Sequence, residues 1–338
     1  MPEGMTTYGD INQRTAAWVI KEMLAHAVPR QVLAKFGTGK EVPKNTADTI
    51  KFRRPIPFTA ATNPLTEGVT PLSQKMQYED VTVLLRQYGA PVEITDKIKD
   101  MAEDPVLKNA SELCGQQAST TLETILWGIL KAGTNVFYAG TADTSRTDVN
   151  DPISLGRQRL ITRALRAQYA EPVTKVLRAS VEVGTEPVAA SYVALGHTDL
   201  ESDIRNMTGF VSVEKYGQMK TVHENEIGKV ETCRYVLSPL LTPFAGAGNS
   251  SLNGMLSTSG KVDVYPVVYF GQDAYGKVNL RGENAITPIV VDPGKASKSD
   301  PLAQRGYVSW KTWFAAAILN EAWMIRMECG VTANPTGT

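Results

Sequence analysis

Two histidine-containing stretches are the first places in this sequence to look for chemistry. His197 follows an apolar run at 192–196 and stands two residues before Asp199, so a histidine and a carboxylate at the end of a strand offer a general base. A hydrolase also needs a nucleophile beside that base, and no Gly-x-Ser-x-Gly elbow occurs. We therefore favour a histidine at a helix entry, beside the capping-box pattern that runs from Thr198 to Glu201.

The second stretch places His223 beside Glu224 and Glu226, which offers nitrogen and oxygen ligands. These residues lack the helical spacing that aims several ligands at one metal ion, so we expect a solvated turn. His26 has no companion ligand near it in the sequence. A cytosolic α/β hydrolase or metalloenzyme built around His197 or His223 remains the rival function, but we predict no catalytic residue, no metal and no cofactor.

Two glycine patterns resemble nucleotide-binding loops without completing them. Gly37 to Lys40 ends like a phosphate-binding loop, but Ala34 stands where the first glycine belongs and Glu41 where serine or threonine reaches magnesium. The pair Gly246 and Gly248 lacks the third glycine of a dinucleotide-binding turn. We predict a linker over 35–45 and a surface loop after residue 244.

Composition excludes several classes of protein. The 338 residues contain 35 Lys plus Arg and 35 Asp plus Glu, so no overall charge favours nucleic acid or an anionic membrane. The three cysteines are far apart and form no CxxC pair, which predicts buried free thiols in a reducing compartment. Neither a signal peptide nor a membrane-spanning run is recognisable, so we expect no membrane contact.

The most unusual element is an extended stretch with a proline-containing tip. Apolar residues alternate over 49–58 and again over 77–94, and the tip at 59–73 is rich in Thr, Pro, Asn and Gly. This pattern predicts one long β-hairpin with apolar groups on both faces. A two-stranded ribbon is marginally stable alone, so another chain would have to cover it. The predicted contact residues are Arg53, Arg54, Leu65, Glu67, Val69, Lys75 and Tyr78.

Two helices and a mixed region flank the hairpin. An apolar stripe predicts a helix between Asp10 and Pro29, and the longest helical pattern runs from the Asp104 cap to Gly133. Short alternating strands and helices follow, which predicts an α/β unit. A helix opened by Asp151 and Pro152 would carry three arginines in helical spacing, either as a solvated face or as contacts to packaged polyanion: Arg159, Arg163 and Arg166.

The C-terminal part of the chain predicts long strands. Aromatic and apolar residues alternate from Gly306 to Cys329 and include Trp310, Trp313 and Trp323. We expect both the strand around Trp310 and the one after Trp323 to pack on the long helix.

Several short motifs resemble those of one known family. They are TTYGDINQ at 6–13, KFRR at 51–54, PLTEGVTP at 64–71, VEITDK at 92–97, AGTNVFYA at 132–139, HTDLESDIRNM at 197–207 and EIGKVE at 226–231. Together they resemble the major capsid proteins of tailed phages with the HK97-like fold, and more narrowly the N4-like phage major capsid family.

The resemblance implies an α+β fold and a division of the chain. The expected parts are an N-terminal arm at 1–46, an extended hairpin called the E-loop with a P-domain strand at 47–99, a spine helix of the P-domain at 100–133, an A-domain at 134–300, and C-terminal P-domain strands at 301–338.

The resemblance also implies a function. The chain would assemble through hexamers and pentamers into the icosahedral head that encloses double-stranded phage DNA. Its partners would be copies of itself, a portal, separate scaffolding or decoration proteins, and DNA bound non-specifically. It would assemble in the host bacterial cytoplasm and reside in the virion capsid. A minor head decoration protein is a second alternative.

Overall fold

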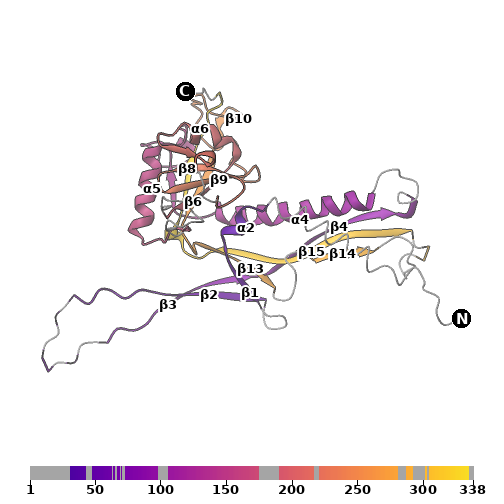
Figure 1. The fold of residues 1–338 in the computed structure, drawn as a ribbon, viewed down its shortest axis with the longest axis horizontal. Coiled ribbons are helices and arrows are strands. Elements are labelled where there is room, and N and C mark those ends of the chain that lie inside the picture. Colours follow the sequence, from indigo (N-terminus) through magenta and orange to yellow (C-terminus); the bar gives the residue numbers. More distant parts are fainter. Residues whose placement is uncertain are drawn as a thin grey trace.

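The computed structural model shows an extended molecule with one compact end (Figure 1). It describes residues 31–42, 48–62, 64, 67–68, 70, 73–97, 106–174, 190–216, 221–280, 287–291, 301–302 and 304–334. The helix expected between Asp10 and Pro29, and His26 with it, lies outside these ranges. A long helix and a sheet extend from the compact end, and a two-stranded ribbon projects away from both.

The long helix, α4 (Val106–Leu130), organises the centre of the molecule. Its 25 residues span roughly 37 Å at about 1.5 Å per residue. One stripe is buried at helical spacing and includes Cys114, Ala118, Leu122 and Leu126, as predicted. Leu113 departs from the predicted stripe because its side chain is 63% exposed.

A five-stranded sheet lies along α4. Its strands are β1 (Thr38–Val42), β4 (Arg86–Thr95), β13 (Tyr275–Leu280), β14 (Thr287–Val291) and β15 (Arg305–Ile318). The 14-residue β15 is central, because β4 pairs with one of its edges while β14 and β13 pair with the other. Val308, Trp310 and Phe314 are buried in the same core cluster as the α4 stripe. Trp310 also donates its indole N–H to Gln117 Oε1 at 3.1 Å.

The compact end is built on a seven-stranded sheet covered on both faces. Residues of β6 (Tyr192–Gly196) alternate between two cores, with Val193 and Leu195 in the cluster around α4 and Tyr192 and Ala194 in a second cluster. That second cluster also contains Ile161 and Leu165 of α5 (Leu155–Ala167), as well as residues of α6 (Glu201–Arg205). The sheet order is β5 (Val136–Tyr138), β16 (Met324–Cys329), β12 (Tyr265–Phe270), β6 (Tyr192–Gly196), β9 (Cys233–Leu237), β8 (Glu226–Val230) and β7 (Phe210–Ser212).

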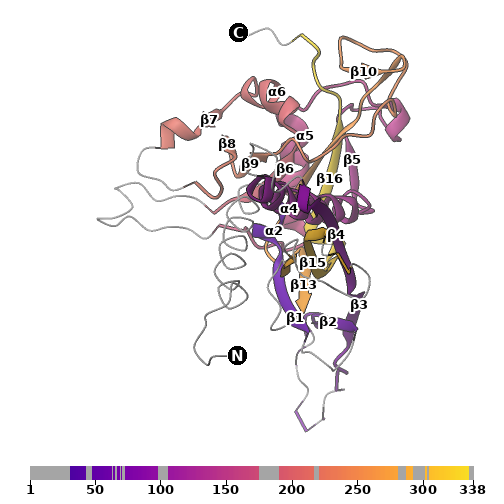
Figure 2. The same cartoon turned by 90° about the vertical axis from the view of Figure 1, so that its right-hand side faces the viewer.

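The remaining elements are short. They are α2 (Leu33–Phe36), α5 (Leu155–Ala167), α6 (Glu201–Arg205), η3 (Arg146–Asp148), η4 (Thr198–Leu200), η5 (Val213–Tyr216), η6 (Glu321–Trp323) and the two-stranded β10 (Ser257–Thr258) and β11 (Lys261–Val262). Figure 2 shows the seven-stranded sheet on one side of α4 and the strands β13 and β15 on the other.

The ribbon consists of β2 (Thr49–Pro55) and β3 (Tyr78–Leu84), paired antiparallel. Its root is fixed by a small third core in which Val83 packs with Val278 and Ala315 of the five-stranded sheet, and Phe52 and Val81 are partly buried there. The predicted hairpin is therefore present but shorter than expected. Its second arm ends at Leu84, because β4 leaves the ribbon and pairs with β15 instead.

The predicted linker over 35–45 is wrong for most of its length. Residues 33–36 form α2, and β1 pairs in parallel with β13 from Thr38 to Val42. The sequence pattern failed because β1 lies at the sheet edge, where Gly39, Lys40 and Glu41 are exposed and only Val42 is buried. An edge strand with one buried residue carries no apolar alternation to read.

Two further expectations need correction. The helix after residue 150 begins at Leu155 with Ser154 as its cap, not at Pro152, which forms an isolated bridge with Gly330. The C-terminal strands divide between the two sheets, since β15 lies along α4 while β16 pairs with β12 and β5 in the seven-stranded sheet. The prediction that both would pack on the long helix holds for β15, whereas β16 meets the core around α4 at Met324 and lies mainly in the other sheet. Alternation alone does not reveal which sheet a strand joins.

Cys114, Cys233 and Cys329 are buried free thiols, as predicted, and the reducing compartment stays a prediction. Among the described helices, none combines the length and apolar character that a membrane crossing requires.

The α4 core yields a stability prediction with an internal control. Leu126→Ala should lower the free energy of unfolding by about 2–5 kcal/mol, because Leu126 is 1% exposed and its removal leaves a cavity. Leu113→Ala on the same helix should cost less than about 0.5 kcal/mol, since that side chain faces solvent. Urea unfolding of both variants checks this. Equal losses of unfolding free energy in the two variants would mean that the buried face of α4 is assigned wrongly.

Candidate subunit interface

Charged pairs hold the two strands of the ribbon together. Arg53 lies opposite Asp80 and Arg54 opposite Glu79. Arg53 donates to both Asp80 carboxylate oxygens, at 2.8 and 3.1 Å, and Arg54 pairs with Glu79. The hydrogen bond from Arg53 holds the pKa of Asp80 below its usual value. These arginines are therefore already paired within their own ribbon.

Apolar side chains stand exposed just beyond these pairs. The exposed fractions are 44% for Ile56, 56% for Phe58, 62% for Met76 and 50% for Tyr78. Ile56 N–H donates to the Gln77 carbonyl at 2.9 Å, so the two arms are still held together where this group begins. We call Ile56, Phe58, Met76 and Tyr78 the ribbon patch. Large apolar groups gathered on a projecting element are typical of a protein interface.

The predicted contact residues do not all lie in one place in the structure. Arg53, Arg54 and Tyr78 come together at the ribbon, with the Arg53 guanidinium 5.4 Å from the centre of the Tyr78 ring. Glu67 and Lys75 are exposed nearer the tip. Leu65 and Val69 lie outside the described residues.

Sequence reasoning missed three members of the patch, Ile56, Phe58 and Met76. Ile56 and Phe58 continued the alternation of the strand and so were taken as part of it. Strand pairing in fact ends at Pro55, and the alternation beyond it was the available signal for an exposed apolar group.

His197 is a structural residue at a helix entry, as favoured from the sequence. Its Nδ1 accepts the Asp199 backbone N–H at 3.2 Å and so caps η4 itself, which replaces the predicted capping box of Thr198 and Glu201. The Asp199 carboxylate accepts a hydrogen bond from the Tyr265 hydroxyl at 2.8 Å. Both members of the suspected pair therefore fix the turn after β6.

His223 does not lie in a solvated turn, so that prediction was wrong. The residue is 7% exposed, its Nδ1 accepts the Asn225 backbone N–H at 3.0 Å, and its Nε2 lies 3.3 Å from the Gln31 carbonyl, to which it donates. Because both ring nitrogens are engaged, neither is available to a metal. The nearby Glu226 accepts from the Tyr216 hydroxyl and the Val222 N–H. Within the described ranges, no three His, Cys, Asp or Glu side chains converge as metal ligands would.

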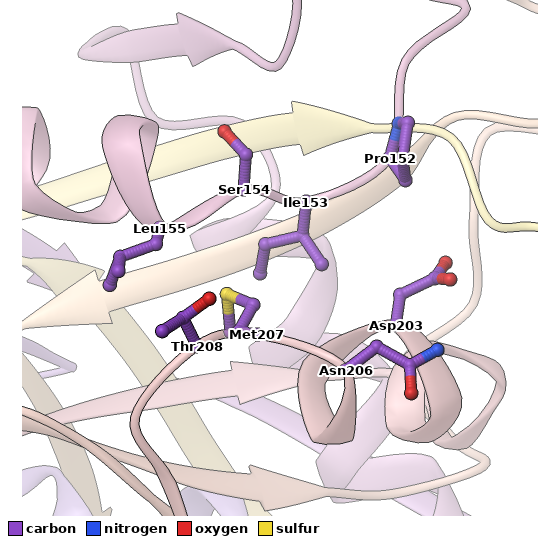
Figure 3. A pocket seen from close by; sticks show the side chains of 8 residues that line it. All are labelled: Pro152, Ile153, Ser154, Leu155, Asp203, Asn206, Met207 and Thr208. Atoms are coloured by element: carbon purple, nitrogen blue, oxygen red, sulfur yellow. The ribbon is translucent and has the colours of Figure 1, made fainter. Parts of the chain in front are cut away.

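A cavity of about 290 Å³ lies between the entry to α5 and the end of α6 (Figure 3). Two of its polar side chains already serve the fold, since Ser154 caps α5 and Asp203 Oδ2 accepts the Thr332 N–H at 3.0 Å. Ile153 and Met207 form its apolar wall. Neither His197 nor His223 lines it, so it does not place either suspected histidine beside a nucleophile.

The arginines of α5 are less available than their spacing indicates. Arg159 pairs with Glu231, with Nε to Oε1 at 2.9 Å. Arg163 and Arg166 are exposed. The structure thus leaves all three predicted polyanion contacts at the surface, with the Arg159 guanidinium already held by Glu231.

The environment of His223 predicts a pH dependence of stability. Burial lowers the pKa of His223 from its ordinary 6.5. The unfolded chain therefore binds a proton before the folded chain does, so stability falls as pH drops below about 6.5 towards the lower folded pKa. His223→Gln should lower stability at pH 8 and flatten this fall between about pH 7 and 5.5. Thermal unfolding at several pH values measures it, and an unchanged slope would contradict the assignment.

Comparison with known proteins agrees with this architecture. Residues 78–327 match the model of the family described as phage capsid protein. The chain is 21% identical over 264 residues to the major capsid protein of Pseudomonas phage KPP21, covering 71% of this chain and 65% of that one. The chain thus spans somewhat less than two thirds of that relative's length.

Solved structures show the same fold at low identity. The capsid of Ralstonia phage GP4 superimposes with a TM-score of 0.65 at 12% identity and covers 92% of each chain. The capsid of cyanophage P-SCSP1u gives a TM-score of 0.58 at 12% identity, over 88% of each chain. These likenesses confirm the predicted α+β HK97-like fold. They leave the narrower N4-like assignment a prediction.

The matched family is one of structural proteins, so the enzyme alternative is not supported. Because the family model covers most of the chain, the extended helix, the two sheets and the projecting ribbon have a common explanation: this chain belongs to the phage capsid protein family.

Proposed function

We propose that this chain is the major capsid protein of a tailed phage and that it assembles through hexamers and pentamers into the head enclosing double-stranded DNA. The observation that carries the proposal is the ribbon patch, which projects from a body that has its own core (Figure 1). Family membership and the capsid fold support it.

A neighbouring copy is the partner that best suits this ribbon. The body has its own cores around α4 and the seven-stranded sheet, and the ribbon shares a core with the body at its root. Arg53 and Arg54 of the ribbon are paired in cis with Asp80 and Glu79, so beside the ribbon patch their charges are already balanced. Rings of identical subunits use head-to-tail contacts of this kind, in which a projection of one copy covers the body of the next.

We propose the following division of the chain: an arm over 1–46, the E-loop and a P-domain strand over 47–99, the spine over 100–133, the A-domain over 134–300 and P-domain strands over 301–338. In three dimensions the five-stranded sheet would serve as the P-domain sheet and the seven-stranded sheet as that of the A-domain. β13 and β14 then belong with the spine although they precede residue 300, and β16 belongs with the A-domain although it follows it.

We further propose a portal, separate scaffolding or decoration proteins, and packaged DNA as partners, with assembly in the host cytoplasm. Arg163 and Arg166 are exposed cations of α5 that suit non-specific DNA contact better than Arg159, which is paired with Glu231, and such contact would be electrostatic and sensitive to salt.

A double substitution in the ribbon patch tests the function. Phe58→Ser with Met76→Ser should leave the thermal unfolding of the free subunit nearly unchanged, because both side chains are more than half exposed. Shell formation should be lost, since the contact would no longer bury apolar area. Sedimentation and negative-stain microscopy measure assembly in the parent and the variant.

Leu113→Ser is the matched control, because Leu113 is equally exposed but lies on α4. Normal shells from the double variant would show that the ribbon patch is not part of the interface between copies. A parent that forms only small oligomers would favour the decoration protein instead, and a compact monomer with hydrolytic activity would revive the enzyme alternative.

A further inference from the structure

Residues 31–36, which we call the latch segment, lie where the two sheets meet. Val32 and Leu33 are fully buried in the core cluster that joins α4 and β15 to strands β6 and β12 of the other sheet. The chain itself crosses between the five-stranded and seven-stranded sheets at 271–274 and 319–323, and residues 131–135 lead from α4 into β5 of the seven-stranded sheet. These short connections and the shared core make up the joint between the two sheets. Figure 1 shows α2 beside α4 at this joint.

Buried polar groups hold the latch segment on the side of α4 and β13. Glu123 is 2% exposed, and its carboxylate accepts the Leu33 N–H at 3.0 Å and the Ala34 N–H at 3.2 Å. The Tyr275 hydroxyl donates to the Leu33 carbonyl at 2.7 Å, and Lys277 Nζ donates to the Ala34 carbonyl at the same distance. Groups from two elements therefore bind both the N–H and the carbonyl groups of one short backbone.

Other contacts hold the latch segment on the side of the seven-stranded sheet. His223, in the loop before β8, donates to the Gln31 carbonyl at 3.3 Å. The Phe36 ring lies 6.1 Å from the His223 ring and 5.9 Å, edge-on, from that of Phe270 in β12. The chain then turns at Gly37, where a Cβ would lie 2.7 Å from the Tyr275 ring, and continues into β1.

We propose that the latch segment is a conformational lock that fixes the angle between the two sheets. It is continuous with the five-stranded sheet through β1 and docks on the seven-stranded sheet through Gln31 and Phe36. Undocking would leave the buried Glu123 without its N–H donors, so the docked arrangement is separated from a released one by several bonds that break together. The connections between the sheets would then act as hinges.

The use of such a lock rests on the proposed function. A single chain that forms both five-membered and six-membered rings must adopt more than one shape, and a joint with a releasable contact allows this without unfolding either sheet. The existence of the lock, however, is a property of one subunit and can be measured without any shell.

Distances between the sheets in unassembled subunits test the lock. Leu113→Cys on α4 and Tyr169→Cys after α5 place spin labels on side chains that are 63% and 87% exposed, while the three native cysteines are buried. The otherwise unsubstituted chain should give one narrow distance distribution by pulsed electron paramagnetic resonance. Phe36→Ala should shift and broaden it. The backbone amides of Leu33 and Ala34 should exchange with solvent roughly tenfold faster or more.

Tyr275→Phe is the matched control. It removes one hydrogen bond to the latch segment but leaves the contacts to the seven-stranded sheet, so the distance distribution should stay narrow. If Phe36→Ala does not fold, the milder Phe36→Leu is used in the same way. Faster exchange at Leu33 and Ala34 with an unchanged distance distribution would overturn the proposal.

Different results would contradict the lock and the proposed function. If the unsubstituted chain forms no shells, the capsid function is wrong whatever the spin labels report. If that chain forms shells but its sheet-to-sheet distance does not respond to Phe36→Ala, only the lock is wrong.

Discussion

The burial of one stripe of α4 against two different sheets is the interaction on which the rest of the structure depends. Leu122, Leu126 and Leu130 share a core with Trp310 and Phe314 on one side and with Val268 and Phe270 on the other. Because a single helix serves both sheets, the compact end and the extended end are parts of one cooperative body. Burial of large apolar side chains at roughly 25 cal/mol per Å² is the main term that holds this body together.

The exposed ribbon is explained by the same packing, because most of it lies outside the core around α4. Its root shares a small core with β13 and β15, but past Pro55 the chain has no second layer to cover it. Because the body buries its own apolar residues around α4, it can carry the uncovered ribbon without losing its fold. In a shell-forming protein the uncovered apolar residues supply the energy of contact between copies, which the folding of one chain does not provide.

The sequence predicted the elements whose signals are local and strong. The α4 stripe and the antiparallel ribbon have regular apolar spacing, Tyr192–Gly196 is a continuous apolar run, and each element is present. Strand β1 was missed because only Val42 is buried at an exposed edge. The place of β16 depends on pairing with β12 and β5, which alternation does not encode. His223 was misplaced because two groups that it contacts, the Gln31 carbonyl and the Phe36 ring, are far away in the sequence.

Site-specific cross-linking from the ribbon patch tests the central claim most directly. A photoreactive side chain at position 58 in assembled shells should join the ribbon of one copy to the body of another, giving covalent dimers and longer chains whose linked peptides map to a single region. The same substitution in dissociated subunits should give almost no intermolecular product. Cross-links confined to the ribbon's own chain in intact shells would contradict the claim that this ribbon binds a neighbouring copy.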